Sequence, residues 1–196
     1  MPKSLTLILI TIITLGCADP FSSRDPQTPA TEQGTFIQPS EPQLVLLNLE
    51  FAYEEQVITN FIRCLDSSFF FKYDFINEQF GVEDSGWTFA SELKLTENLF
   101  NNLLADTTLS ISITLTDLEQ TTDQFFDTSA VLYRSYLISS VRHQDGMVST
   151  DSTTFKGTSI FTLIENEQGL WSISKWEDQH QRTDRPSWAD FKNNYR

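Results

Sequence analysis

GLWSISKWED, residues 169–178, is the segment from which the fold of this chain can be inferred. Trp171 and Ile173 are two residues apart, so they would share one face of a β-strand, because side chains alternate between the faces. Trp176 would fall on the opposite face unless one residue bulges out of the strand. Since bulges bend sheets, the segment indicates a strand in a curved sheet.

Upstream residues indicate further strands. Apolar residues alternate with Thr and Ser over 109–115, which is the period of two expected for a half-buried strand. Strands are also expected over 130–141 and 153–164, with hairpin turns at 144–146 and 166–169. Together these segments predict an antiparallel meander.

Helices are expected before these strands. Apolar residues recur at helical spacing over 41–66, which predicts one long helix or two abutting ones, opened by a capping box at Ser40. A short aromatic strand is expected over 69–75, then a loop over 78–86 and another helix over 87–102. Because helices come first and strands last, the order predicts an α+β domain with helices on one face of a curved sheet.

Two stretches resemble a known superfamily. QVITNFIRCLD (56–66) followed by FFF (69–71) resembles the second helix and first strand of nuclear transport factor 2-like proteins, and GLWSISKWED resembles their closing strand. The resemblance covers about residues 41–178. It implies a cone-shaped α+β fold with N-terminal helices packed on a curved antiparallel sheet. The layout is also similar to that of uncharacterised bacterial lipoproteins with a SnoaL-like domain.

The first residues have the pattern of an export signal. MPKSLTLILITIITLGC (1–17) has a positive charge at Lys3 and an apolar run that is too short to span a bilayer core, which needs about 20 residues. Its end, ITLGC, resembles the lipobox of bacterial lipoproteins, with Thr14 where the family usually has Leu, Val or Ile. The resemblance implies cleavage after Gly16 and a lipid on the Cys17 thiol. The alternative is an ordinary signal peptide with an incidental cysteine.

These patterns predict a division of the chain into four segments. They are a signal peptide over 1–16, a lipidated cysteine and disordered tether over 17–40, a domain over 41–178, and a polar tail over 179–196 in which Pro186-Ser187-Trp188 is the candidate start of a short helix. The lipid on Cys17 would hold the protein in the cell envelope. In lipoproteins with this kind of signal, an Asp directly after the cysteine often marks retention in the inner membrane. Here Ala18 follows the cysteine, so the resemblance favours the outer membrane if the organism has one.

Charge and cysteine content exclude several partners. A formal net charge of -14 argues against binding nucleic acid or anionic lipid headgroups, because both rely on Lys and Arg. With Cys17 lipidated, Cys64 is the one remaining thiol, so no internal disulfide is expected. The apolar helical stretch around Cys64 predicts a buried and inert thiol.

The sequence carries no pattern typical of a metal or cofactor site. Two His and one mature Cys give no zinc spacing, and there is no Gly-x-Ser-x-Gly elbow or Gly-rich phosphate loop. Asp117, Glu119 and Asp123 lack the spaced ligands of a calcium loop, so a solvated turn is expected there. His143 and His180 are expected at the surface.

Two functions are consistent with these observations. The first is a non-catalytic, lipid-anchored protein whose domain binds a small apolar ligand or a protein partner, a second copy included. The alternative, implied by the resemblance, is an isomerase or hydrolase of the ketosteroid isomerase or polyketide cyclase type, with Asp66 or Asp74 as acid–base group and Tyr53 or Tyr136 as oxyanion donor. An interior carboxylate without a compensating cation would favour the enzyme. An interior filled by Phe and Trp would favour the binding protein.

An aromatic pocket is predicted between the helices and the sheet. Tyr53, Trp87, Tyr136 and Trp176 are its expected walls, because apolar surfaces with a few polar tips are typical of small-molecule sites. The alternative is that these four residues are plain core. Arg134 lies on the same face of its strand as Tyr136, and it is expected to be solvated because unpaired charge is rarely buried.

Overall fold

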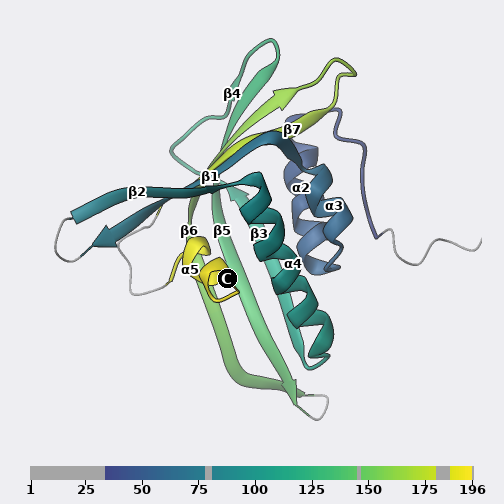
Figure 1. Ribbon diagram of the computed structural model, residues 1–196, viewed down its shortest axis with the longest axis vertical. Coiled ribbons are helices and arrows are strands. Elements are labelled where there is room, and N and C mark those ends of the chain that lie inside the picture. Colours follow the sequence, from purple (N-terminus) through teal and green to yellow (C-terminus); the bar gives the residue numbers. More distant parts are fainter. Residues whose placement is uncertain (1–33, 78–80, 145–146, 180–185, 196) are drawn as a thin grey trace, which may run out of the picture. The chain divides into compact units, whose positions relative to one another are not determined.

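The computed structural model describes residues 34–77, 81–144, 147–179 and 186–195, which form helices and one mixed sheet (Figure 1). The helices are α2 (Pro42–Glu54), α3 (Ile58–Arg63), α4 (Phe89–Ala105) and α5 (Trp188–Asn193). The strands are β1 (Leu65–Asn77), β2 (Gly81–Thr88), β3 (Leu109–Asp117), β4 (Gln124–Phe125), β5 (Ser129–Gln144), β6 (Met147–Glu165) and β7 (Trp171–Gln179). Within these ranges, no helix is long and apolar enough to cross a bilayer.

The sheet has the strand order β2-β1-β7-β6-β5-β3, with β4 paired to β5. The strands β3, β5, β6 and β7 pair antiparallel, as the meander predicted. One difference is that β1 joins β7 in parallel, with Tyr73 opposite Asp178, so the sheet is mixed. Figure 1 shows α2, α3 and α4 together on one side of the sheet, and the core lies between these layers.

The predicted bulge is present in β7. The pairing with β6 passes from Lys175 directly to Ile173, which leaves Ser174 as the extra residue. Its hydroxyl donates to the carbonyl oxygen of Thr162 at 3.1 Å. In consequence the residues on both sides of the bulge face the core: Trp171, Ile173, Trp176 and Asp178 are all buried.

A strand replaces the loop that was expected over 78–86. The part of this stretch that the structure describes belongs to β2, which pairs with β1 as an antiparallel hairpin. Gly86 permits this pairing, because a Cβ at that position would clash with the backbone carbonyl of Phe71. The polar composition suggested a loop, but hydrogen bonds to a neighbouring strand stabilise an extended backbone whatever its side chains prefer.

The segment 41–66 contains two helices rather than one. The break lies at Gln56, whose φ of 52° is in the left-handed region and cannot continue a helix. Its side-chain amide donates to the carbonyl oxygens of Tyr53 and Glu54 at 3.3 and 2.7 Å, which satisfies two groups at the end of α2. The predicted capping box at Ser40 is wrong: Glu41 is the N-cap residue, without a side-chain capping bond.

Residues on both sides of the predicted domain 41–178 pack against it. Asn48 accepts a hydrogen bond from the backbone N–H of Ile37 at 2.8 Å and donates to its carbonyl at 2.6 Å. The Trp171 N–H donates to the carbonyl of Pro39 at 2.9 Å. Beyond residue 178, Trp188 of α5 is fully buried. Residues 34–40 and 186–195 therefore contribute to the fold, because each supplies backbone or aromatic partners to it.

Deleting Ser174 should unfold the interior. The deletion removes the bulge and turns Trp176 and Asp178 to the opposite face of β7, so the expected loss in the free energy of unfolding is at least about 3 kcal/mol, the cost of losing one buried Trp side chain. Ser174→Ala keeps the residue count and should cost about 1 kcal/mol or less. Urea unfolding of both variants measures the two losses, and equal losses would contradict a role for the bulge.

Candidate functional site

The site with the densest chemistry lies where α5 closes the interior. Ser187 caps this short helix through a capping box: its N–H donates to the Asp190 carboxylate at 2.7 Å, and the Asp190 N–H donates to its hydroxyl at 3.2 Å. The capping box explains why this polar stretch forms a helix at all. Helical spacing then turns Trp188 and Lys192 to the same buried side.

Trp188 fills the space between the helices and the sheet. Its ring packs edge-on against Trp176 with a centroid distance of 4.1 Å, and it contacts the rings of Tyr136 at 5.1 Å and Tyr53 at 5.7 Å. All four side chains are almost completely inaccessible to solvent. A single residue of α5 therefore joins α2, β5 and β7 in one aromatic cluster.

A buried ion pair lies beside this cluster. The Lys192 ammonium is 2.5 Å from Oε1 of Glu92, and neither side chain is more than 1% exposed. The Trp87 indole donates to Oε2 of Glu92 at 2.6 Å, and the Thr96 hydroxyl donates to Oε1 at 3.3 Å. Each oxygen of the Glu92 carboxylate thus has a donor. A buried carboxylate needs such donors to offset its lost hydration.

Aromatic rings surround the other side of the Lys192 ammonium. Its Nζ lies 4.1 Å from the centroid of the Trp176 ring and 4.4 Å from that of Phe71, within the range of cation–π attraction. Burial lowers the pKa of Lys192 below its ordinary value, although attraction by the Glu92 carboxylate opposes the shift. The site is therefore a carboxylate inside an aromatic enclosure, occupied by an ammonium group of the same chain.

A second buried carboxylate holds the beginning of α5. Asp178 accepts hydrogen bonds from the Tyr136 hydroxyl at 2.7 Å and from the Ala189 N–H at 2.8 Å. The Trp188 N–H donates to the same Tyr136 hydroxyl at 2.8 Å. Gly157 leaves room for this hydroxyl, because a Cβ there would clash with it. Both polar groups are therefore engaged in binding the first turn of α5.

Burial shifts the pKa values of both Asp178 and Tyr136. It raises the pKa of Asp178 from its ordinary 3.8 to about 6, although the hydrogen bonds from Tyr136 and Ala189 act in the opposite direction. Burial also raises the pKa of Tyr136, and the negative charge of Asp178 adds to that shift. At neutral pH the structure thus holds Tyr136 as a neutral hydrogen-bond donor.

The structure brings three of the four predicted pocket residues round one side chain. Tyr53, Tyr136 and Trp176 all contact Trp188. Trp87 is separated from them by Phe71, on which it stacks at 4.3 Å. The interior space that the pocket hypothesis assigned to a ligand thus holds Trp188 and the head of Lys192.

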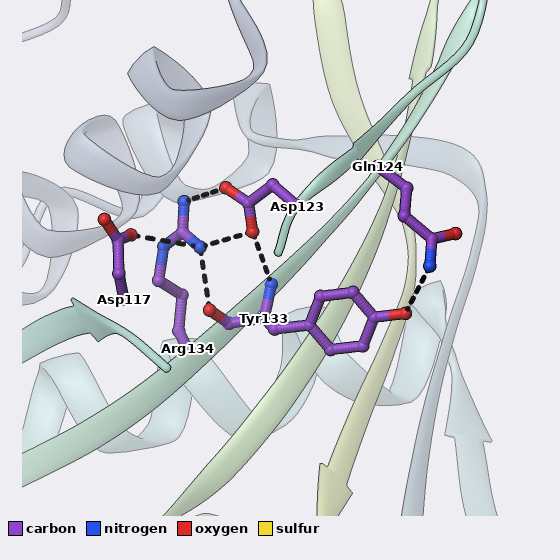
Figure 2. A network of polar contacts seen from close by, with 5 residues as sticks. All are labelled: Asp117, Asp123, Gln124, Tyr133 and Arg134. Atoms are coloured by element: carbon purple, nitrogen blue, oxygen red, sulfur yellow. Dashed lines mark hydrogen bonds and ion pairs between the residues drawn. The ribbon is translucent and has the colours of Figure 1, made fainter. Parts of the chain in front are cut away.

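Arg134 corrects two expectations. It is 6% exposed rather than solvated, and its guanidinium binds both carboxylate oxygens of Asp123 at 2.8 Å (Figure 2). Asp117 lies 3.2 Å from the same group. The acidic turn is therefore not simply solvated, because two of its carboxylates neutralise a buried cation, while Glu119 is exposed. Among the described residues, no cluster of His, Cys, Asp and Glu could hold a metal ion.

The other candidate residues lie outside this site or outside the described residues. Asp66 accepts hydrogen bonds from Ser68, which lower its pKa and make it a turn residue. Cys64 is buried as predicted, and burial raises the pKa of its thiol to about 12. The residues that fall outside the described part are Gly16, Cys17 and His180, together with the side chains of Asp74 and His143.

Glu92, Lys192 and Trp188 were missed at the sequence level. Glu92 has the position of an ordinary helix-surface residue, and Lys192 lies in a stretch assigned to a polar tail. One signal was available: Ser187-x-x-Asp190 has the spacing of a capping box and precedes an apolar side chain at Phe191. That pattern predicts an amphipathic helix, although it does not reveal the partner of Lys192.

Comparisons with known proteins find a likeness to this chain in structure only. No protein-family model matches it, and no curated protein matches it. A structure of naphthalene 1,2-dioxygenase with indole bound in the active site has a TM-score of 0.56 and 11% identity, over 74% of this chain and 79% of the other. A conserved protein from Planctomyces limnophilus has a TM-score of 0.52 and 10% identity, over 70% and 91%. An NTF2-like protein with a cystatin-like fold from Novosphingobium aromaticivorans has a TM-score of 0.48 and 11% identity, over 75% of this chain and 82% of the other.

These likenesses, at such low identity, establish the fold and no activity. The chain shares an α+β fold with the first two of these structures, with helices first and a sheet of long strands after them, which is the architecture that the resemblance implied. A fold of this kind serves unrelated functions, so the function has to be inferred from the groups in the site.

Breaking the buried ion pair on one side should strongly destabilise the protein. Lys192→Met and Glu92→Gln each leave one buried charge without its partner, and each should cost about 3–5 kcal/mol of unfolding free energy. The double variant Glu92→Gln with Lys192→Met should lose much less than the sum of the two. Lys175→Met, at the exposed pair with Glu177, is the matched control and should cost about 1 kcal/mol or less. Additive losses in the double variant would contradict direct pairing.

Asp178 should make the stability of the fold depend on pH. Because its pKa is higher in the folded state than its ordinary 3.8, its contribution is complete below about pH 4 and falls as the pH rises through about 6. The difference in unfolding free energy between wild type and Asp178→Asn should therefore decrease by roughly 3 kcal/mol from about pH 4 to about pH 7. Chemical unfolding across this range measures it, and a constant difference would show that the carboxyl group is not perturbed.

Proposed function

We propose that this chain is a lipid-anchored cell-envelope protein whose domain binds a ligand or a protein partner without catalysing a reaction. One observation carries the non-catalytic part: α5 occupies the interior, and Lys192 compensates the Glu92 carboxylate there. A catalytic acid or base must come within hydrogen-bond reach of its substrate. Glu92 already has a donor on each oxygen and no exposed surface. The Glu92 carboxylate therefore has a structural role, as the partner of Lys192 and Trp87.

The second candidate function is the isomerase or hydrolase. The observation that favours it is Asp178 with Tyr136, since a carboxyl group with a pKa of about 6 beside a neutral hydroxyl is suited to proton transfer. Against it, the Ala189 N–H occupies the second carboxylate oxygen, and Trp188 lies over Tyr136. This chemistry would require α5 to leave its place.

Binding at the outer surface fits the closed interior better. A depression of about 770 Å³ lies between the outward-facing residues of β3, β5 and β6 and the turn after β3. Thr114, Ser135 and Lys156 line it with hydroxyl and ammonium groups, and Leu137 adds an apolar side chain that is 40% exposed. This mixture suits a small apolar ligand with a polar end or a partner protein, a second copy of the chain included.

The anchoring part of the proposal rests on the sequence. The apolar run that ends at Gly16-Cys17 supports attachment of a lipid to the Cys17 thiol, and two or three acyl chains on one residue give a durable anchor. Ala18 after the cysteine favours the outer membrane in an organism that has one.

The anchoring is tested with the full-length chain. Wild-type protein should partition with membranes and carry acyl mass on a peptide that begins at Cys17, whereas Cys17→Ser should be released and carry none. Membrane fractionation and mass spectrometry measure both properties. A wild-type chain without acyl mass, or a Cys17→Ser chain that stays in the membrane, would refute the anchor.

The closed interior is tested on the purified protein with indole, which has the shape of the side chain that Trp188→Ala removes. Indole should leave the unfolding temperature of the wild type unchanged, whereas Trp188→Ala opens a cavity among Tyr53, Tyr136 and Trp176 that indole should fill and stabilise. Leu104→Ala, at a side chain that is 58% exposed, is the control and should behave like wild type. Stoichiometric uptake by wild type that Trp188→Ala abolishes would favour the enzyme instead.

A further inference from the structure

The Lys192 ammonium lies between walls that belong to other parts of the fold. Oε1 of Glu92 is 2.5 Å from its Nζ, and the centroids of the Trp176 and Phe71 rings are 4.1 and 4.4 Å away. We call Glu92, Trp176 and Phe71 the ammonium cage; they come from α4, β7 and β1. Proteins bind ammonium ligands between aromatic faces of this kind, and the carboxylate adds the opposite charge. The walls are therefore supplied without α5, whose contribution is the cation.

Helix α5 presents this cation together with an aromatic ring. Trp188 precedes Lys192 by four residues, so both side chains lie on the same buried side of the helix. The Lys192 Nζ is 5.6 Å from the centroid of the Trp188 ring. That ring fills the space bounded by Tyr53, Tyr136 and Trp176. An indole ring and an ammonium at this separation are the recognition features of an arylalkylammonium compound.

The docking of α5 leaves buried polar atoms without partners. Among the described residues, the buried side-chain polar atoms that lack a hydrogen bond are the Tyr53 hydroxyl, the Trp188 indole nitrogen and Oδ1 of Asn193. The Trp188 N–H and the Thr96 hydroxyl approach the Tyr53 hydroxyl closely enough to oppose the rise that burial causes in its pKa, but without the geometry of a hydrogen bond. Two of these atoms belong to α5, and the third lies on a ring that contacts it. Each such atom destabilises the docked state.

Helix α5 also has little stability of its own. It comprises six residues, Trp188–Asn193, and a helix of that length does not persist without packing. Undocking would therefore release it as one unit and leave Glu92 without its cation. A compound that supplies both an ammonium and a ring would bind this undocked state alone and so raise its population. A neutral aromatic compound would leave Glu92 uncompensated, so it lacks this effect.

We propose that the ammonium cage and the space of the Trp188 ring form a binding site for an arylalkylammonium compound, and that α5 is a built-in competitor which such a compound displaces. The ring of the ligand takes the place of Trp188, and its ammonium takes the place of Lys192. The site is distinct from the depression between β3, β5 and β6, and it does not depend on the lipid anchor. It adds a closed but releasable ligand site to the proposed function.

The experiment measures hydrogen exchange in the wild-type protein with tryptamine or with tryptophol, which carries a hydroxyl where tryptamine carries the ammonium. The undocked population rises by one plus the ratio of ligand concentration to its Kd for that state. Tryptamine at about ten times that Kd should therefore speed exchange of the α5 amides about tenfold, while β7 keeps its rates. Tryptophol should leave α5 unchanged. Mass spectrometry of peptides covering 187–194 and 171–179 reads both segments.

The matched control is the double variant Glu92→Gln with Lys192→Met. It removes one charge of each sign, so the net charge stays at -14 and general attraction of a cation to the surface is preserved. This variant should respond equally to tryptamine and tryptophol, whereas Lys175→Met should respond like wild type. If the double variant does not unfold cooperatively, the two compounds on wild type decide the question alone.

Three results would overturn the proposal. They are α5 exchange that tryptamine leaves unchanged or slows, an equal response of wild type to tryptophol, and a preference for tryptamine that survives in the folded double variant. Each of them would leave the lipid anchor and the surface depression of the proposed function untouched, because neither involves Glu92 or Lys192.

Discussion

The extra residue in β7 determines which groups face the interior. Because Ser174 is left out of the pairing with β6, Trp176 and Asp178 lie on the same face as Trp171. Without the bulge both would face outward. Trp188 would then lose the ring on which it packs at 4.1 Å, and Ala189 would lose the carboxylate that accepts its N–H. The docking of α5, and with it the closed interior, depends on this one irregularity of strand pairing.

The closed interior contains charges that satisfy one another. Taking a carboxylate and an ammonium out of water costs several kcal/mol for each ion, and pairing repays this only when the remaining donors and acceptors are also used. Glu92 meets that condition through Lys192 and the Trp87 indole, and the rings of Trp176 and Phe71 face the ammonium. A ligand entering here would have to replace every one of these contacts. The same fold that serves an enzyme elsewhere is here filled by its own C-terminal helix.

The closed interior is connected to the β4–β5 hairpin at the surface of the molecule. Arg134 links the two regions, because its guanidinium holds the hairpin through Asp123 while its strand also carries Tyr136 into the core. The acidic turn after β3 therefore has a structural role, with Asp117 and Asp123 neutralising a buried cation. Asp117 also lines the depression on the sheet, so this framework supports part of the exposed surface.

Patterns a few residues long determined most of the fold. The alternation over 109–115, the helical spacing over 41–66 and the odd spacing between Ile173 and Trp176 each depend on near neighbours, so the strands, the helices and the bulge could be predicted from sequence. The loop-like composition over 78–86 did not reveal β2, because the extended backbone there is stabilised by pairing with β1 rather than by its own side chains.

The candidate site was decided by the tertiary structure alone. Glu92 and Lys192 are 100 residues apart, and nothing in either neighbourhood indicates that the other will neutralise it. Arg134 likewise gives no local sign that Asp123 will fold over it. From sequence, a charged residue is expected to be solvated when no partner lies near it in the chain. Whether it is buried depends on a contact that only the folded chain creates.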